Sequence, residues 1–97
     1  MIIVHDIFIA KPGQASKLAK KFKEAMADVK EVVTIMTDVT GAYNKVVMVS
    51  QYESLSAYEK NMEQYMQNAE AAEKMKKAME GYHDMYLSGS REIYRSN

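Results

Sequence analysis

The chain has 97 residues, the size of one domain with a single hydrophobic core. Thirteen Lys and Arg residues balance thirteen Asp and Glu residues, so no overall positive charge favours binding to nucleic acid or to an anionic membrane. The absence of cysteine excludes disulfides, thiolate nucleophiles and Cys-ligated metals, and no apolar run approaches the roughly 18 residues of a membrane span.

The first third of the chain is predicted to form a strand, a helix and a second strand. Residues 2–9 are rich in β-branched and aromatic side chains and end at a Lys-Pro-Gly turn, which indicates a strand. No basic stretch precedes this short apolar run, so we expect no signal peptide and a cytoplasmic location. From about residue 13 to residue 28, apolar side chains recur on one helical stripe and most lysines lie off it. Residues 32–37 return to strand character.

A turn and a third strand come next. The polar cluster of residues 38–44 contains Gly41, which suits a positive φ, and is short enough to join antiparallel neighbours. Residues 45–52 form the third expected strand.

The last part of the chain is predicted to be helical and then to return to the sheet. Ser54 is the expected cap of a long helical region, with a break near residues 67–69 where Asn68 would cap a second helix. Gly81 is the expected stop. After Ser88-Gly89-Ser90, which we expect to be flexible, residues 91–95 are predicted to form a polar edge strand. The order β-α-β-β-α-β over residues 1–97 indicates one α+β domain of ferredoxin-like fold, with an antiparallel sheet and helices on one face.

The central strands are apolar on both faces, whereas a sheet with one solvated face should alternate apolar and polar residues. Two helices can cover only one face, and an uncovered apolar patch is rare on soluble monomers. We therefore expect a homodimer formed through the second face of the sheet. The alternation in the first strand sets Ile3, Ile7 and Ile9 against Ile2, Val4 and Phe8, and in the third strand it sets Val46 and Met48 against Val47 and Val49.

Several local sequences resemble those of the dimeric α/β-barrel superfamily that contains the antibiotic-biosynthesis-monooxygenase-like and NIPSNAP-like proteins. The resemblance extends over nearly the whole chain and lies in structural rather than catalytic residues. These are Lys11-Pro12-Gly13-Gln14, Thr37-Asp38-Val39-Thr40-Gly41, Tyr52-Glu53-Ser54-Leu55 and Ser90-Arg91-Glu92-Ile93-Tyr94-Arg95.

The resemblance implies a dimeric barrel with a pocket in each subunit between sheet and helices. Relatives include cofactor-free oxygenases acting on quinol-like aromatics, haem-degrading oxygenases, small isomerases and proteins without known activity. The haem-degrading members use an Asn on the first strand, a Trp and a helix His. This chain has Asp6 on the first strand, no Trp, and His83 late in the sequence, so haem degradation is not expected.

The two histidines are the candidate catalytic residues, because imidazole exchanges protons near neutral pH. His5 lies within the first strand, on the face of Ile3 and Ile7. A half-buried histidine or a dimer contact is the structural alternative for His5. His83 follows the helical region, where the helix dipole alone favours a histidine.

Tyrosines and methionines are the candidate ligand-binding residues. Helical spacing places Tyr58, Met62 and Tyr65, with Met66 beside them, on a face aimed at the sheet. If the helix stands off from the sheet, these side chains line an apolar pocket for a flat aromatic molecule. Plain core packing is the alternative. Tyr43, in the turn between the second and third strands, would lie at the rim.

The sequence thus predicts a homodimeric protein that binds a small apolar or aromatic molecule between sheet and helices. The alternative is a cofactor-independent monooxygenase or isomerase acting on an aromatic or quinol-like substrate, with His5 or His83 as base. We expect no cofactor, no metal site, and no nucleic-acid or membrane partner, because no metal-ligand cluster, phosphate-binding loop or nucleophile motif occurs.

Overall fold

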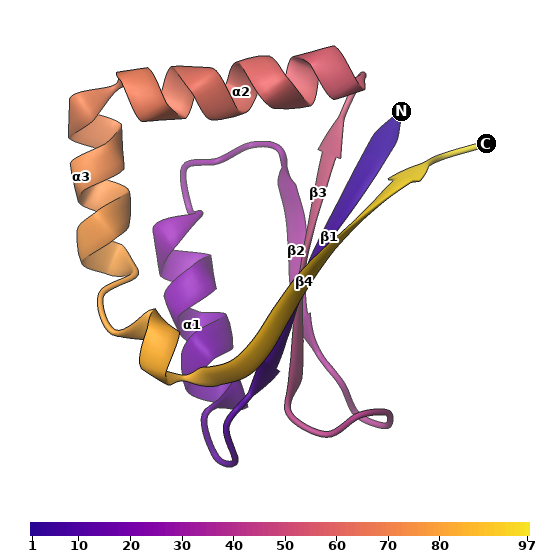
Figure 1. Ribbon diagram of the computed structural model, residues 1–97, viewed down its shortest axis with the longest axis vertical. Helices are drawn as coiled ribbons and strands as arrows, with labels where there is room; N and C mark the ends of the chain where they lie inside the picture. The colour runs from indigo at the N-terminus through magenta and orange to yellow at the C-terminus, as the bar shows by residue number, and fades with distance from the viewer.

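The computed structural model describes all 97 residues, as one four-stranded sheet with every helix on the same side of it (Figure 1). The strands lie in the order β2-β3-β1-β4, and all three neighbouring pairs are antiparallel. This arrangement confirms the predicted α+β ferredoxin-like fold. The elements in chain order are β1 (Ile2–Ala10), α1 (Ala15–Ala25), β2 (Val32–Thr37), β3 (Lys45–Tyr52), α2 (Leu55–Gln67), α3 (Ala69–Ala78), the 3-10 helix η1 (Tyr82–Asp84) and β4 (Tyr86–Arg95).

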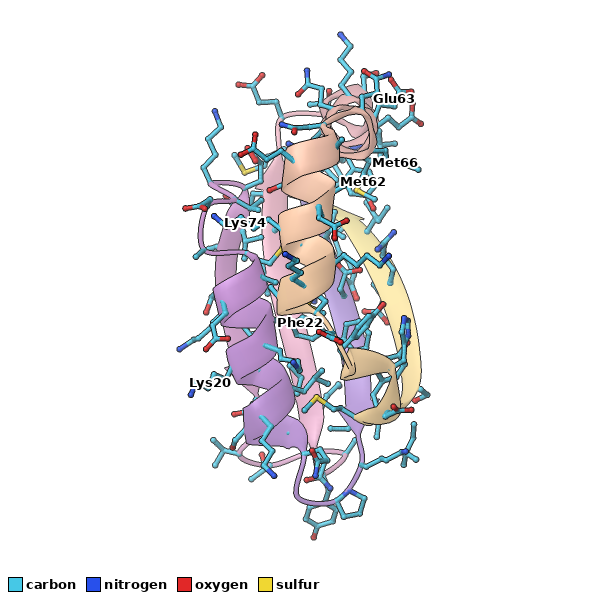
Figure 2. The ribbon with its side chains drawn as sticks, turned by 90° about the vertical axis from the view of Figure 1, so that its left-hand side faces the viewer. Lys20, Phe22, Met62, Glu63, Met66 and Lys74 are labelled. Carbon is cyan, nitrogen blue, oxygen red and sulfur yellow. The ribbon has the colours of Figure 1, made fainter.

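The helices form a frame over one face of the sheet. In Figure 1, α1 and α3 run beside each other along the strands, and α2 leads from the upper end of β3 away from the sheet to α3. Figure 2, turned by 90°, again shows α1 and α3 next to each other in front of the strands. None of the helices has the length and hydropathy needed to cross a bilayer.

A capping side chain begins each of the helices α2 and α3. Ser54 Oγ accepts a hydrogen bond of 3.1 Å from the Ala57 N–H at the start of α2. Asn68 ends α2 and begins α3, and its Oδ1 accepts a hydrogen bond of 3.1 Å from the Ala71 N–H. Each bond satisfies a helix N–H that has no partner within the helix. The predicted break and both predicted caps are confirmed.

The core lies where α1 packs on β1 and β3. Leu18 and Phe22, four residues apart on α1, are buried against Ala10 of β1 and Val46 of β3. Phe8 extends this cluster, with its ring centroid 4.9 Å from that of Phe22. The densest packing is therefore under α1, at one end of the sheet.

Two of the element boundaries predicted from the sequence need correction. Residues 88–90, expected to be flexible, belong to β4 and pair with residues 7–9 of β1. The pairing is possible because Gly89 leaves room for the Phe8 ring; a Cβ at this position would lie 3.3 Å from two ring carbons. The helix expected to reach residue 28 ends at Ala25, and η1 was not predicted.

In the single chain the helices cover one face of the sheet and leave the other open, as expected because two helices can cover only one face. The covered face carries Ile2, Val4, Asp6, Phe8 and Ala10 of β1, and all of these except the half-buried Phe8 are buried. On the open face, where no helix lies, the side chains of the inner strands are largely apolar (Figure 1). The apolar and aromatic residues of the open face are Ile3, His5, Ile7 and Ile9 of β1, Met36 of β2, Val47 and Val49 of β3, and Tyr94 of β4. The same face also carries the polar residues Thr34, Lys45, Gln51, Ser88, Ser90 and Glu92.

Candidate functional site

A cavity lies between the covered face of the sheet and the frame formed by α2 and α3. Although both helices carry an apolar stripe, neither contains a fully buried residue, so the stripe is not filled by packing. Two adjoining lobes make up this space, which we call the sheet–helix cavity. The larger lobe measures about 460 Å³ and the smaller about 260 Å³. The larger lobe alone has the size of a typical small-molecule site, roughly 300–1,000 Å³.

The lobes share their central lining and differ at their ends. The larger lobe extends past Phe8 and Phe22 toward Tyr82. The smaller lobe extends beneath α2 toward Tyr52 and Tyr58. The residues common to both lobes are Asp6, Met26, Met48, Tyr65, Met75 and Arg91.

Methionine dominates the apolar lining. Unbranched thioether side chains adapt to ligands of different shape, and they make favourable contacts with aromatic rings. In Figure 2, Met62 and Met66 lie near the junction of α2 with α3. The cavity is therefore suited to a flat or flexible apolar molecule. Six of the nine methionines line one or both lobes: Met26, Met48, Met62, Met66, Met75 and Met79.

An ion pair is the main polar feature of this apolar surface. Arg91 Nε of β4 donates a hydrogen bond of 2.5 Å to Asp6 Oδ1 of β1, the residue directly opposite it in the strand register. The Asp6 side chain is 11% exposed, whereas that of Arg91 is 50% exposed. The hydrogen bond to Asp6 raises the pKa of Arg91 further above its usual value. The cavity thus holds a fixed, charge-balanced pair.

Tyrosines line both ends of the cavity. Tyr52 and Tyr58 meet edge to face in the smaller lobe, with ring centroids 5.0 Å apart. Burial raises the pKa of Tyr52, and burial likewise raises the pKa of Tyr82 in the larger lobe. These phenols therefore remain neutral donors and acceptors of hydrogen bonds at physiological pH.

The structure brings together most of the predicted ligand-binding group. Tyr58, Met62 and Tyr65 line the smaller lobe, and Tyr65 also lines the larger lobe with Met66. Tyr43 lies apart from them: it is 83% exposed in the loop between β2 and β3 and lines neither lobe.

Neither histidine lines the cavity. His5 is on the open face of the sheet, where its ring meets that of Tyr94 edge to face at 5.2 Å. His83 is exposed in η1, with Nδ1 3.4 Å from the Tyr86 hydroxyl. Within one chain, the geometry therefore gives neither histidine a position from which to act on a molecule in the cavity. No group of three or more His, Asp or Glu side chains is arranged to hold a metal ion.

Sequence reasoning missed the role of Asp6 and Arg91 in this cavity. A signal was present, since Asp6 is the one charged residue on the otherwise apolar covered face of β1. A buried carboxylate requires a partner. What the sequence did not provide was the register of β4, which puts Arg91 rather than Arg95 opposite Asp6.

Comparison with known proteins gives one family match and several structural matches. The family model named NIPSNAP matches residues 6–87. Among curated proteins, none matches the chain significantly.

Solved structures with this fold include two NIPSNAP proteins. A NIPSNAP family protein from Agrobacterium tumefaciens superposes with a TM-score of 0.79 at 12% identity, over 99% of this chain and 92% of that one. An uncharacterised NIPSNAP domain protein from Burkholderia xenovorans gives 0.82 at 11% identity, over 100% and 95%. A proposed antibiotic biosynthesis monooxygenase from Nitrosomonas europaea gives 0.68 at 11% identity, over 99% and 98%. At such identities these likenesses establish the fold alone.

Proposed function

The chain belongs to the NIPSNAP family, and we propose that it is a homodimeric protein that binds a small apolar or aromatic molecule in the sheet–helix cavity. The observation that carries this proposal is the unfilled space beneath α2 and α3. Helices with apolar stripes normally bury them against the sheet, because removing apolar surface from water stabilises the fold. Here the stripes face a cavity instead.

The lining supports a ligand with a large apolar part. Ten of the thirteen residues around the larger lobe are hydrophobic, as are nine of the thirteen around the smaller lobe. A few polar groups set among such residues are typical of sites that orient a small molecule. Among the residues that line both lobes, Asp6, Arg91 and Tyr65 carry polar groups.

The open face of the sheet supports the homodimer. Met36 and Tyr94 on this face are 43% and 48% exposed in the single chain. Tyr94 lies opposite the half-buried Ile3 of β1, and Met36 lies opposite the half-buried Val47 of β3. No helix lies on this side of the sheet (Figure 1). A second copy related by a twofold axis would cover the same surface on both chains at once.

The alternative of a cofactor-independent monooxygenase or isomerase has less support. It requires a base within hydrogen-bonding distance of a bound substrate, directly or through one water. Neither of the proposed bases, His5 and His83, lines either lobe. The geometry of the single chain therefore favours binding over catalysis by either histidine.

Native mass spectrometry of freshly purified protein tests dimer and ligand together. We expect the mass of two chains of 11.1 kDa each, with any retained small molecule as added mass. Titration with 2-naphthol, an uncharged flat aromatic, tests the cavity directly by fluorescence. Met75→Trp should abolish this binding by filling the space shared by the lobes, whereas Val39→Trp, in an exposed loop, should not. The mass of a single chain would contradict the proposed homodimer. Equal binding of 2-naphthol by Met75→Trp and Val39→Trp would contradict the proposed ligand site.

A further inference from the structure

We infer that the molecule bound in the sheet–helix cavity is uncharged and carries one head group in which a hydrogen-bond acceptor stands beside a donor, as in a primary amide. This inference rests on the proposed function and specifies the chemical class of its ligand. It depends on the charge balance and on the unused hydrogen-bonding capacity of Asp6 and Arg91.

The charge balance excludes an anionic head group. In the smaller lobe, Asp6 and Arg91 are the only charged lining residues, and they already neutralise each other. A carboxylate placed beside Arg91 would add a second negative charge next to Asp6, in surroundings that are mostly apolar. Like charges at such a distance repel, and a desolvated charge without its own partner is costly. Lys76 is the one further charged residue of the cavity, and it is a solvent-exposed residue of the larger lobe.

The unused hydrogen-bonding groups of Asp6 and Arg91 indicate which head group the pair would bind instead of an anion. A guanidinium has five N–H donors, and only Arg91 Nε is used by Asp6. The Nη groups of Arg91 remain available as hydrogen-bond donors, because the Arg91 side chain is half exposed. Asp6 Oδ1 accepts the bond from Arg91, whereas Oδ2 accepts none within the chain. Because no buried side-chain oxygen lacks a partner, Oδ2 must be accessible.

The Nη donors of Arg91 and the Oδ2 acceptor of Asp6 are therefore available side by side in the lining that the two lobes share. A carbonyl oxygen would accept from Arg91 Nη, and an adjacent N–H or O–H would donate to Asp6 Oδ2. A primary amide offers both groups in one plane. The apolar body would then extend over Met48 and Met75 toward Tyr58 or Tyr82.

Two probes with the same ring system test this head group. Binding of 2-naphthamide and 2-naphthoate is measured by fluorescence at neutral pH. We expect the wild-type protein to bind the amide at least about tenfold more tightly, equivalent to about 1.4 kcal/mol. A carboxylate that binds as tightly as the amide would overturn the inference and leave the proposed function standing. Failure of 2-naphthol and both naphthalene probes to bind would overturn the proposed function itself.

Substitutions of Asp6 and of Arg91 should change the preference for 2-naphthamide over 2-naphthoate in opposite directions. Asp6→Asn leaves Arg91 without its counter-charge, so the order should reverse in favour of 2-naphthoate. Arg91→Gln leaves Asp6 negative, so discrimination against 2-naphthoate should increase. The control is Asp28→Asn, which removes a carboxylate from the exposed pair of Asp28 with Lys74 and should keep the wild-type order. Failure of the order to reverse in Asp6→Asn, or a discrimination in Arg91→Gln no greater than that of the wild type, would each contradict the inference.

Discussion

Asp6 and Arg91 lie opposite each other on β1 and β4 and form an ion pair on the covered face of the sheet, although 85 residues separate them in the sequence. The pair joins the edge strand β4 to the centre of the sheet and also lines both lobes of the cavity. Substitutions of this pair should therefore affect both the stability of the fold and the proposed ligand preference.

Removing Arg91 should destabilise the fold, because the nearly buried Asp6 carboxylate then loses its partner. Breaking a fully buried pair costs about 3–5 kcal/mol. The Arg91 side chain is half exposed, so we expect Arg91→Gln to cost about 1–2 kcal/mol after allowing for solvent screening. Urea unfolding followed by circular dichroism measures the difference. Adding Asp6→Asn should restore part of the loss, and Arg95→Gln, an exposed arginine on the same strand, should change stability by less than about 0.5 kcal/mol.

Gly89 should resist replacement by alanine. In most strand interiors this change is stabilising, because glycine loses more backbone entropy on folding. Here the added Cβ would lie 3.3 Å from the Phe8 ring, which is held between Phe22 and Tyr86. We expect Gly89→Ala to destabilise the protein by about 1 kcal/mol in urea unfolding. A stabilised Gly89→Ala protein would show that the ring moves aside, and Ser90→Ala serves as the neighbouring control.

A charge on the open face should prevent the proposed dimer from forming. Val47 is a half-buried residue at the centre of this face in the single chain, opposite Ile7 in the register. A lysine there would place an unpaired charge in the interface at a cost of several kcal/mol. Sedimentation velocity at micromolar concentration should show a dimer for the wild type and a monomer for Val47→Lys. Val39→Lys makes the same change at a residue that is 99% exposed and should remain dimeric.

Alkaline pH should reveal the burial of Tyr52. Because burial raises its pKa above the ordinary value of 10.0, the folded chain retains a proton that the unfolded chain releases. The contribution of Tyr52 to stability is complete below pH 10.0 and is lost as pH rises through the raised pKa. From about pH 9 to about pH 11, the free energy of unfolding should fall less steeply for Tyr52→Phe than for the wild type. Tyr43→Phe, at an exposed loop residue, should follow the wild type; identical slopes for all three proteins would contradict this account.

Much of the fold could be predicted because local chemistry determined it. The Ser54 and Asn68 caps and the two apolar faces of β1 depend on neighbouring residues only. The start of β4 could not be predicted, since Ser88-Gly89-Ser90 has the composition of a loop. These residues form a strand because they pair with β1 and because Gly89 accommodates Phe8.

The site was predictable in part. Helical spacing correctly placed Tyr58, Met62 and Tyr65 on one lining surface. The pair of Asp6 and Arg91 depends on a register between the two ends of the chain, which local patterns do not encode. The cytoplasmic location and the homodimer stay predictions.

Ligand binding in the sheet–helix cavity is tested most directly by NMR of the methionine methyl groups. Six methionines line the cavity, and Met1, Met36 and Met85 do not. With 13C-methyl labelling and 2-naphthol as ligand, we predict saturable shifts that are largest for the six cavity methionines, assigned by single Met→Leu substitutions. Met1 and Met36 should shift little. Shifts confined to these two residues, or no saturable shifts at all, would contradict a ligand site between sheet and helices.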